Sequence, residues 1–556
     1  MAADELIFLP LGGVGEIGMN FALYGFGPKA ARQWIIVDCG VTFPGPDLPG
    51  VDLVMPDIGF ARSLGDALKG IIITHAHEDH YGALTALWPM LRKQVWMTPF
   101  TAGLLEAKAS SEPDAPKIPV KIFKAGDKFT VGPFSIEAVH VAHSIPEPVS
   151  LILRTPLGNV VHTADWKIDA EPSLGADTDR AAFERVGNEG VIALVCDSTN
   201  AMRSGISPTE TAVSTSLAEI IAQAPGRVAI TTFSSNVGRI RTIAMAAKTA
   251  GRSVLLMGLS MKRVAEVSQS LGYLDGLDEF VEEDEYDKFD RNKIVIILTG
   301  SQGEDRAALA KLSRDDHPRV HLTAGDTVIY SSRTIPGNEK PILETQNRLT
   351  EMGIDIITDE MALVHVSGHP RQSELEQMYA WVKPEVLVPV HGEAMHLAAQ
   401  ARLGAAAGIA QISPIKNGDM LRLAPGPAEI IERIKAGRFY KDGRVIGSEQ
   451  EIGVGIRRKL SFAGLVACSI VVDRNGRLAD EIDVALHGLP EMTPDGDAFD
   501  DVIFDAVASA VESIPPAKRK DEETVMRAAE RAIRAAAREH WGKKPLVTVF
   551  VAKVLT

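Results

Sequence analysis

Cysteine is scarce in this sequence. Cys39, Cys196 and Cys468 are the only three among 556 residues, and no two form a CxxC pair. This count excludes a disulfide framework and a thiolate zinc site, and it is typical of a reducing compartment. The sequence also has no apolar run of about 20 residues, the length that crosses a membrane, and no basic segment before its short N-terminal apolar run. We therefore expect a cytoplasmic protein with no signal peptide and no membrane interaction.

Positive charge is also in short supply. The chain has 58 basic and 73 acidic side chains, a formal net charge of −15. This balance excludes a protein that coats nucleic acid through its overall charge, because phosphate neutralisation drives such binding. It does not exclude an enzyme with a local basic channel or bound metal ions. Charged residues make up 24% and apolar residues 45%, which excludes disorder, collagen-like repeats and coiled coils.

The order of the expected elements predicts several domains. Residues up to 207 consist mainly of short β-rich runs, at 34–38, 70–74, 134–140 and a hairpin at 149–163. Strands and helices then alternate from 208 to about 300, which is typical of a parallel α/β unit. Strands are expected again at 363–366 and 386–390. A new unit begins near 460, with two strands, two helices and a final strand at 546–554.

A glycine motif near the N-terminus imitates a dinucleotide-binding fingerprint. Gly13, Gly15 and Gly18 spell GxGxxG after an apolar strand, and Asp38 follows about twenty residues later. The fingerprint requires a helix directly after the glycines. Residues 19–26 instead read as the second strand of a hairpin, so the motif does not indicate nucleotide binding.

The motif that carries chemistry lies at 74–80, Thr-His-Ala-His-Glu-Asp-His, after the apolar run at 70–73. It offers His75, His77, Asp79 and His80 as metal ligands. Imidazole and carboxylate groups suit zinc, manganese and iron rather than calcium. The chain has only 14 histidines, so three within this segment argue against an incidental polar loop.

One loop cannot complete two coordination shells, so other strand ends should supply further ligands. His143, Asp165 and His391 each follow an apolar run. Asp165 is suited to bridge two cations, because one carboxylate has two oxygens. His140 and His162 compete for the same roles, but packing or a hydrogen bond to a ligand is the favoured interpretation for both. A metal-bound histidine usually donates its other N–H to such a partner, and Asp38 is a candidate for that role.

HxHxDH followed by separated His, Asp and His resembles the metallo-β-lactamase family, which implies an αββα sandwich with metals at the sheet edge. That fold serves many hydrolases and does not fix the substrate. The unit between Asp165 and His391 resembles the β-CASP insert of nucleic-acid-processing enzymes, in which Asp197 and His369 match a strand-end acid and a histidine. The segments LGGVGEIGMN, HSIPE, DSTNA, TGSQGE and IPGN resemble the ribonuclease J family over the full chain. Ala76 and Ala164 stand where glycines are common.

The resemblance implies an α/β protein built from a sandwich, an inserted parallel β-CASP domain and a small α+β C-terminal domain. The expected domains are 1–207 and 369–450 for the sandwich, 208–368 for the insert, 451–459 for a linker and 460–556 for the C-terminal domain. The C-terminal domain is expected to support a homodimer or homotetramer. No sequence feature identifies partners in RNA degradation.

By the same resemblance, two divalent ions, zinc foremost with manganese or magnesium as alternatives, support hydrolysis of single-stranded RNA. The family is a 5′-to-3′ exonuclease with endonuclease activity in RNA maturation and decay. His369 is expected to donate a hydrogen bond or proton at the scissile phosphate, and Asp197 to orient it.

A pocket for a 5′-monophosphate is expected where a strand ends and a helix begins. The residues expected to form it are Phe233, Ser234, Ser235, His365, Val366, Ser367, Gly368 and His369. The alternative is that Ser234 to Asn236 only cap the helix. Arg239 and Arg241 are expected either to line an RNA channel or to be solvated. A structural divalent cation, Ca²⁺, is implied near Gly50, Asp52 and Asp442.

Other functions remain open from the sequence. The chain can be another metallo-β-lactamase-fold hydrolase, such as a β-CASP DNA nuclease or a thioesterase-like enzyme. A scaffold protein that kept the fold would have broken ligands, whereas all seven expected metal ligands are present.

Overall fold

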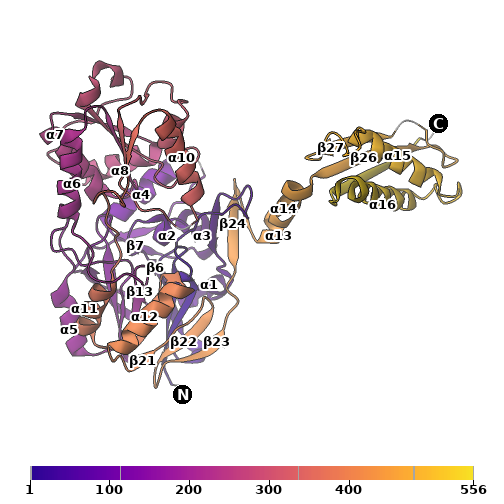
Figure 1. Ribbon diagram of the computed structural model, residues 1–556. Coiled ribbons are helices and arrows are strands. Elements are labelled where there is room, and N and C mark those ends of the chain that lie inside the picture. Colours follow the sequence, from indigo (N-terminus) through magenta and orange to yellow (C-terminus); the bar gives the residue numbers. More distant parts are fainter. Residues whose placement is uncertain (1–2, 113, 336, 480–481, 555–556) are drawn as a thin grey trace. The chain divides into compact units, whose positions relative to one another are not determined.

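The computed structural model describes residues 3–112, 114–335, 337–479 and 482–554. The chain forms two compact units. Unit 1 comprises Met1–Phe43 and Val54–Arg438, and unit 2 comprises Pro44–Leu53 and Phe439–Thr556. Helices and strands of both units are labelled in Figure 1. Among the described helices, none combines the length and the apolar character that a membrane crossing requires.

Two large sheets form the base of unit 1. The first has the strand order β23 (Glu429–Arg433), β22 (Asp419–Ala424), β1 (Glu5–Gly12), β3 (Phe21–Gly27), β4 (Gln33–Val37), β6 (Leu68–Ile72), β7 (Val95–Met97) and β8 (Val120–Ile122). The second has the order β21 (Gln411–Ile412), β19 (Pro384–Val390), β13 (Val191–Asp197), β12 (Gly158–His162), β11 (Val149–Thr155), β10 (Phe134–His140) and β9 (Lys128–Val131). The short pair β2 (Val14–Gly15) and β20 (Gly392–Glu393) lies apart from both.

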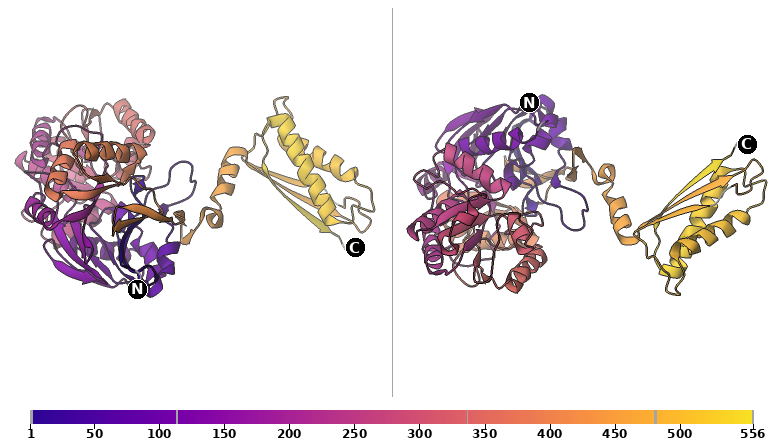
Figure 2. Two further views of the ribbon diagram at one scale, coloured as in Figure 1. Left: turned by 90° about the horizontal axis from the view of Figure 1, so that it is seen from below. Right: turned by 90° about the horizontal axis from the view of Figure 1, so that it is seen from above.

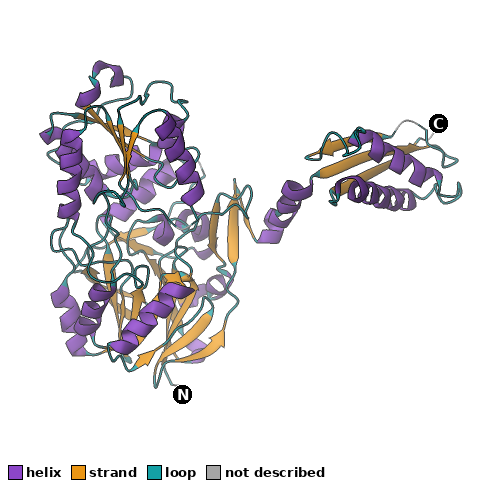
Figure 3. Cartoon of the chain, in the orientation of Figure 1, coloured by secondary structure: helices purple, strands orange, loops and turns teal. Residues whose placement is uncertain are grey.

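The two sheets pack face to face through one apolar core. Phe8, Tyr24 and Ile35 of the first sheet share this core with Leu151 and Val195 of the second. A further cluster packs the second sheet against helices on its outer face. The helices of this sandwich are α1 (Gly59–Ser63), α2 (Glu78–Tyr81), α3 (Leu84–Leu91), α4 (Pro99–Ser110), α5 (Arg180–Glu189), α11 (Gln372–Val382) and α12 (Ala394–Ala406). Figure 3 shows the helices of unit 1 in purple beside its strands in orange.

A parallel sheet is inserted between two neighbouring strands of the sandwich. β13 and β19 pair in parallel, and the insert leaves after the first and returns before the second. Its strand order is β15 (Ser253–Met257), β16 (Ile294–Leu298), β14 (Val228–Thr231), β17 (Thr327–Tyr330) and β18 (Asp355–Ile357). Its helices are α6 (Glu210–Gln223), α7 (Val237–Thr249), α8 (Leu259–Ser270), α9 (Ala308–Ser313) and α10 (Glu339–Glu351). The inner strands β16, β14 and β17 are wholly buried, as a parallel sheet covered on both faces requires, whereas the edge strand β18 is partly exposed.

Asn236 caps the start of α7, as the capping alternative for residues 234–236 predicts. The side chain of Asn236 accepts a hydrogen bond from the backbone N–H of Arg239, and Gly251 adopts a positive φ of 66° just after the helix. The strand predicted at 363–366 is wrong, because these residues form an irregular loop. Alternating apolar residues suggested a strand there, but Val364 and Val366 are buried without any strand partner.

The glycine motif forms a hairpin and not a nucleotide-binding turn. β1 and β3 pair antiparallel, and Gly13, Gly15 and Gly18 all have positive φ angles in the connection between them. A Cβ atom on Gly13 would lie 2.3 Å from the side-chain oxygen of Asn20. The glycines therefore serve a tight connection.

Unit 2 has its own core. β27 (Asp483–His487), β26 (Leu465–Val472) and β28 (Leu546–Lys553) form a sheet, with β26 and β28 parallel. α15 (Phe499–Glu512) and α16 (Glu522–Trp541) cover one face of it, as Figure 2 shows. β24 (Arg438–Asp442), β25 (Val445–Gly447), α13 (Glu449–Ile452) and α14 (Val454–Ala463) precede it in the chain. On α16, Ile533 is fully buried, so the helix is amphipathic and only its charged face is solvated.

The separate core of unit 2 predicts local destabilisation. Ile503 on α15 is fully buried in that core, and Ile503→Ala removes its apolar packing at a cost of about 2–5 kcal/mol. Chemical unfolding of the full-length variant should show the transition of unit 2 shifted to lower denaturant, with the transition of unit 1 unchanged. Equal shifts in both transitions would contradict separate cores.

Candidate metal centre

The seven expected ligands converge at one edge of the sandwich. β12, β13 and β19 run parallel and adjacent, so their carboxyl ends meet there. Asp165 and His391 follow two of these ends, and His143 follows β10 in the same sheet. The segment 75–80 follows β6 of the opposite sheet and continues into α2. Chain connectivity therefore brings both sheets to one site.

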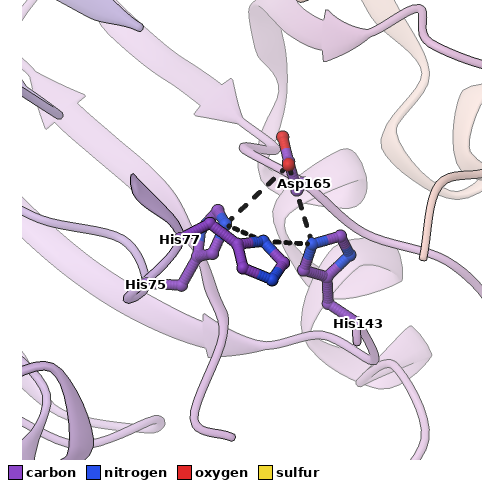
Figure 4. Close-up of side chains that lie close together, drawn as sticks. All are labelled: His75, His77, His143 and Asp165. Atoms are coloured by element: carbon purple, nitrogen blue, oxygen red, sulfur yellow. Dashed lines mark hydrogen bonds and ion pairs between the residues drawn. The ribbon is translucent and has the colours of Figure 1, made fainter. Parts of the chain in front are cut away.

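The first group of donors comprises His75, His77, His143 and Asp165 (Figure 4). His77 Nδ1 lies 3.2 Å from His75 Nε2 and 3.1 Å from His143 Nε2. Asp165 Oδ2 lies 3.8 Å from His75 Nε2 and 3.6 Å from His143 Nε2. A tetrahedral zinc with bonds of about 2.0–2.1 Å separates its ligands by about 3.3 Å, so the spacing fits one metal ion.

The second group comprises Asp79, His80, Asp165 and His391. His391 Nε2 lies 3.2 Å from Asp79 Oδ2, and His80 Nε2 lies 3.3 Å from Asp165 Oδ1. Asp165 thus presents Oδ2 to the first group and Oδ1 to the second. Oδ1 is buried and has no hydrogen-bond partner in the described part of the chain, which leaves it available to a cation.

Hydrogen bonds orient the imidazole rings. In His75, His80, His143 and His391, Nδ1 contacts another group: Thr74 Oγ1 at 3.0 Å, Asp38 Oδ2 at 2.7 Å, the carbonyl of Gly368 at 2.6 Å and Thr199 Oγ1 at 2.8 Å, respectively. Each Nε2 is then directed at the donor groups, as metal-bound histidines require. The sequence indicated Asp38 but not Thr74 or Thr199. The only sequence feature that pointed to Thr74 and Thr199 was their position next to or near the motif residues His75 and Asp197.

His369 belongs to a third group with Asp165, Asp197 and His391. Its Nδ1 lies 2.7 Å from Asp197 Oδ2, and its Nε2 lies 3.9 Å from Asp165 Oδ2. Asp197 Oδ1 accepts hydrogen bonds from the backbone N–H and hydroxyl of Thr199. This geometry is what the orienting role of Asp197 requires. The catalytic roles of Asp197 and His369 stay predictions.

Opposite charges shape the titration of the centre. Burial alone would raise the pKa of Asp165, but the adjacent imidazoles, His391 and His80 foremost, hold it well below its usual value. Burial and the neighbouring imidazole of His80 lower the pKa of His75 well below its ordinary value. The ring nitrogen of His75 is therefore unprotonated and able to bind a metal at neutral pH.

The two competing histidines lie outside all three donor groups. His162 Nδ1 contacts Tyr24 Oη at 2.9 Å beneath the centre, and burial lowers the pKa of His162 to about 4. His140 Nε2 contacts the carbonyl of Ala176 at 2.8 Å. Both histidines therefore make packing and hydrogen-bond contacts.

The expected phosphate pocket lies on loops near the metal centre. Ser234 and Ser235 are partly exposed, and neither hydroxyl makes a hydrogen bond within the described part of the chain. Asn236 lines a pocket that also includes His143 and Ser144. His365 Nδ1 is buried, and no hydrogen-bond partner for it occurs among the described residues. Asn236 caps the helix, but the two serines remain available to a ligand.

Arg239 differs from both expectations for it, since it is neither solvated nor lining a channel. It is fully buried, and its Nη2 lies 2.7 Å from Glu210 Oε2 while Nη1 donates to the carbonyl of Val364 at 2.8 Å. Lys167 lies 3.6 Å from Glu210 and 2.7 Å from Asp169. These buried charges join the loop after Asp165 to the insert and to the loop before His365. Nothing in the local sequence pattern signalled this network.

Gly50, Asp52 and Asp442 are brought together within unit 2. Asp52 Oδ2 accepts a hydrogen bond from the backbone N–H of Gly443 at 2.7 Å. The guanidinium of Arg457 contacts the carboxylate of Asp442 and donates to the carbonyl of Pro49 at 3.3 Å. A divalent cation at this position would have to displace Arg457. The structural cation stays a prediction.

Comparison with protein-family models assigns most of the chain. Residues 33–183 match the beta-lactamase superfamily domain, and residues 353–414 match the Zn-dependent metallo-hydrolase RNA specificity domain. Residues 225–349 match the ribonuclease J beta-CASP domain, and residues 452–554 match the ribonuclease J C-terminal domain. Ribonuclease J of Sinorhizobium meliloti is 61% identical over 100% of this chain and 98% of its own length. The chain belongs to the ribonuclease J family.

More distant relatives agree. Ribonuclease J of Mycolicibacterium smegmatis is 34% identical over 100% of this chain and 98% of its own length. A solved structure of a protein of unknown function from Enterococcus faecalis has a TM-score of 0.52 and 15% identity, covering 75% of this chain and 100% of that one, which shows a shared fold only. The predicted combination of metallo-β-lactamase, β-CASP and C-terminal domains is confirmed. The domain boundaries stay predictions.

The hydrogen bond from His80 to Asp38 predicts how metal affinity responds to mutation. Asp38→Asn replaces the carboxylate that orients His80 and should weaken metal binding about 10–100-fold. Competition with a chelator measures this affinity. Asp66→Asn is the matched control, since Asp66 is an exposed carboxylate in the short 3₁₀ helix Gly65–Ala67, outside the donor groups. If Asp38→Asn binds the metal as tightly as the native protein, Asp38 does not orient His80 for metal binding.

The buried network predicts a large loss of stability. Arg239→Met leaves Glu210 without its buried guanidinium partner, which costs about 3–5 kcal/mol of unfolding free energy. Urea unfolding measures this cost. In the control Arg241→Met, the lost guanidinium bonds go to the carbonyls of Tyr273 and Asp275, and the expected cost is about 1 kcal/mol. Equal costs for the two variants would contradict the importance of the network.

Proposed function

We propose that this protein hydrolyses phosphodiester bonds of single-stranded RNA with two divalent metal ions. Zinc is the first choice, with manganese or magnesium as alternatives. The observation that carries the proposal is Asp165, whose two oxygens face two separate groups of donors. The match to an RNA specificity domain and the ribonuclease J relatives support RNA as the substrate.

The first metal would be held by His75, His77, His143 and Asp165, and the second by Asp79, His80, Asp165 and His391. Bound divalent ions acidify water and offset negative charge on a phosphate. His369 then acts from beside the metals, with Nδ1 fixed by Asp197 and Nε2 directed toward the centre. We assign His369 the donation of a hydrogen bond or proton at the scissile phosphate.

We further propose 5′-to-3′ exonuclease and endonuclease activity in RNA maturation and decay, in the cytoplasm. Ser234, Ser235 and the loop 365–369 would bind a 5′-monophosphate. Free serine hydroxyls beside the start of α7 support this pocket, because helix N-termini attract anions. Unit 2 would mediate assembly of a homodimer or homotetramer.

The phosphate pocket predicts a preference at the RNA 5′ end. One RNA, labelled internally and carrying a 5′-monophosphate or a 5′-triphosphate, should release nucleoside monophosphates faster from the monophosphate form. The double variant Ser234→Ala/Ser235→Ala should lose this preference while its metal content stays that of the native protein. Equal rates on both native substrates would contradict the pocket, and equal turnover of single-stranded DNA would favour a β-CASP DNA nuclease.

The position of His369 predicts a specific catalytic loss. His369→Ala should lower kcat about 10²–10⁴-fold, the usual contribution of a positioned proton donor, while metal content measured on the same sample is retained. His140→Ala is the matched control, because that ring contacts only a backbone carbonyl outside the donor groups. An active His369→Ala enzyme would refute the assigned role.

A further inference from the structure

Three arginines gather around the loop that carries His369. Arg371 lies two residues beyond His369 in the chain. The carbonyl of Arg203 accepts a hydrogen bond from the backbone N–H of Gln372 at 3.0 Å, so the segments of Arg203 and Arg371 adjoin. Arg333 follows Ser331, whose hydroxyl donates to the carbonyl of Val364 at 2.7 Å. Three separate segments therefore bring arginines to this loop.

The guanidinium groups are close enough to influence one another. Partial burial, followed by repulsion from Arg333 and Arg371, lowers the pKa of Arg203. Partial burial also lowers the pKa of Arg333, and Arg371 adds to that effect. Asp359 is the one carboxylate that opposes these effects, and it makes no ion pair with the arginines within the described residues.

These guanidinium groups also have no structural partner. All three side chains are partly exposed, and in the described ranges none forms an ion pair or a side-chain hydrogen bond. Most arginines of the neighbouring insert behave differently. Arg314, for example, contacts Asp305 at 2.8 Å and Asp316 at 3.0 Å. In a chain with a net charge of −15, unpaired and mutually repelling cations indicate an anionic ligand.

The same segments expose apolar side chains. Met202, beside Arg203, is 52% exposed; Ile335, near Arg333, is 46% exposed; and Met361 is 69% exposed. Single-stranded nucleic acids are bound by basic grooves that track the backbone, with aromatic side chains on which the bases stack. Aliphatic side chains such as Ile and Met also contact bases when they insert between base steps. Arginines alternating with exposed apolar residues fit that chemistry better than they fit a free phosphate ion.

We propose that Arg203, Arg333 and Arg371 form a binding site for backbone phosphates of single-stranded RNA beside the metal centre. This inference rests on the proposed function and adds the residues that hold the substrate. Asn200 links the segment of Arg203 to the loop of His369. Its side-chain amide donates to the carbonyl of His369 at 3.1 Å and to Ser367 Oγ at 2.9 Å. The site gives an acidic protein a local attraction for a polyanion.

The test is the salt dependence of turnover by the metal-loaded, full-length enzyme. The plot of log(kcat/KM) against log[KCl], measured on a single-stranded RNA, has a negative slope. The magnitude of this slope decreases by about 0.7 for each lost phosphate contact. The triple variant Arg203→Gln/Arg333→Gln/Arg371→Gln should reduce the magnitude of the slope by about 2 and should raise KM far more than it lowers kcat. Arg314→Gln should keep the native slope, since its charge is already paired on the same insert.

A variant of opposite sign sharpens the test. Asp359→Asn removes the carboxylate that opposes the cluster, so KM for RNA should fall and the salt slope should steepen. Thermal midpoints confirm that every variant is folded. A native slope in the triple variant overturns the site, as does a loss confined to kcat. If the native enzyme turns over no RNA, the proposed function fails. If the native enzyme cleaves RNA but the triple variant has the same salt slope as the native enzyme, only the arginine site fails.

Discussion

The structure depends on one buried carboxylate. Asp165 is almost fully enclosed, and its two oxygens face five imidazoles and the carboxylate of Asp79, which come from three other segments of the chain. Burial lowers the pKa of His75, His77 and His143, and without a cation their unprotonated nitrogens, 3.2 Å and 3.1 Å apart, would gain nothing from this closeness. With cations, the same spacing becomes a coordination shell. Because β12, β13 and β19 are parallel neighbours, their carboxyl ends place Asp165, Asp197 and His391 at a single edge of the sheet.

The inserted unit is held to this edge by buried charges. Lys167 lies two residues from Asp165, and through Glu210 it reaches Arg239, which in turn binds the carbonyl before His365. Asp165, the insert and the loop of His369 are thus parts of one connected structure. Buried ion pairs add little net stability, but they fix relative position, because leaving either charge unpaired is costly.

An acidic protein that acts on RNA needs local groups that attract phosphate. A formal charge of −15 repels RNA at long range, and salt screens that repulsion beyond about 8–10 Å. At short range the proposed metals, the helix N-terminus at α7 and the partly exposed arginines would oppose this repulsion. The net charge therefore excludes binding through overall charge, and the proposals assign the attraction to a few local groups.

The sequence by itself determined the candidate metal ligands and the class of fold. Metal chemistry needs particular residue types at strand ends, so the motif at 75–80 and the strand-end residues His143, Asp165 and His391 could be identified from local pattern. The strand predicted at 363–366 failed because apolar alternation also occurs in a buried loop. Tertiary structure alone decided the burial of Arg239, the orienting roles of Thr74 and Thr199, and the meeting of Arg203, Arg333 and Arg371. These depend on contacts between residues far apart in the chain, and no local periodicity encodes them.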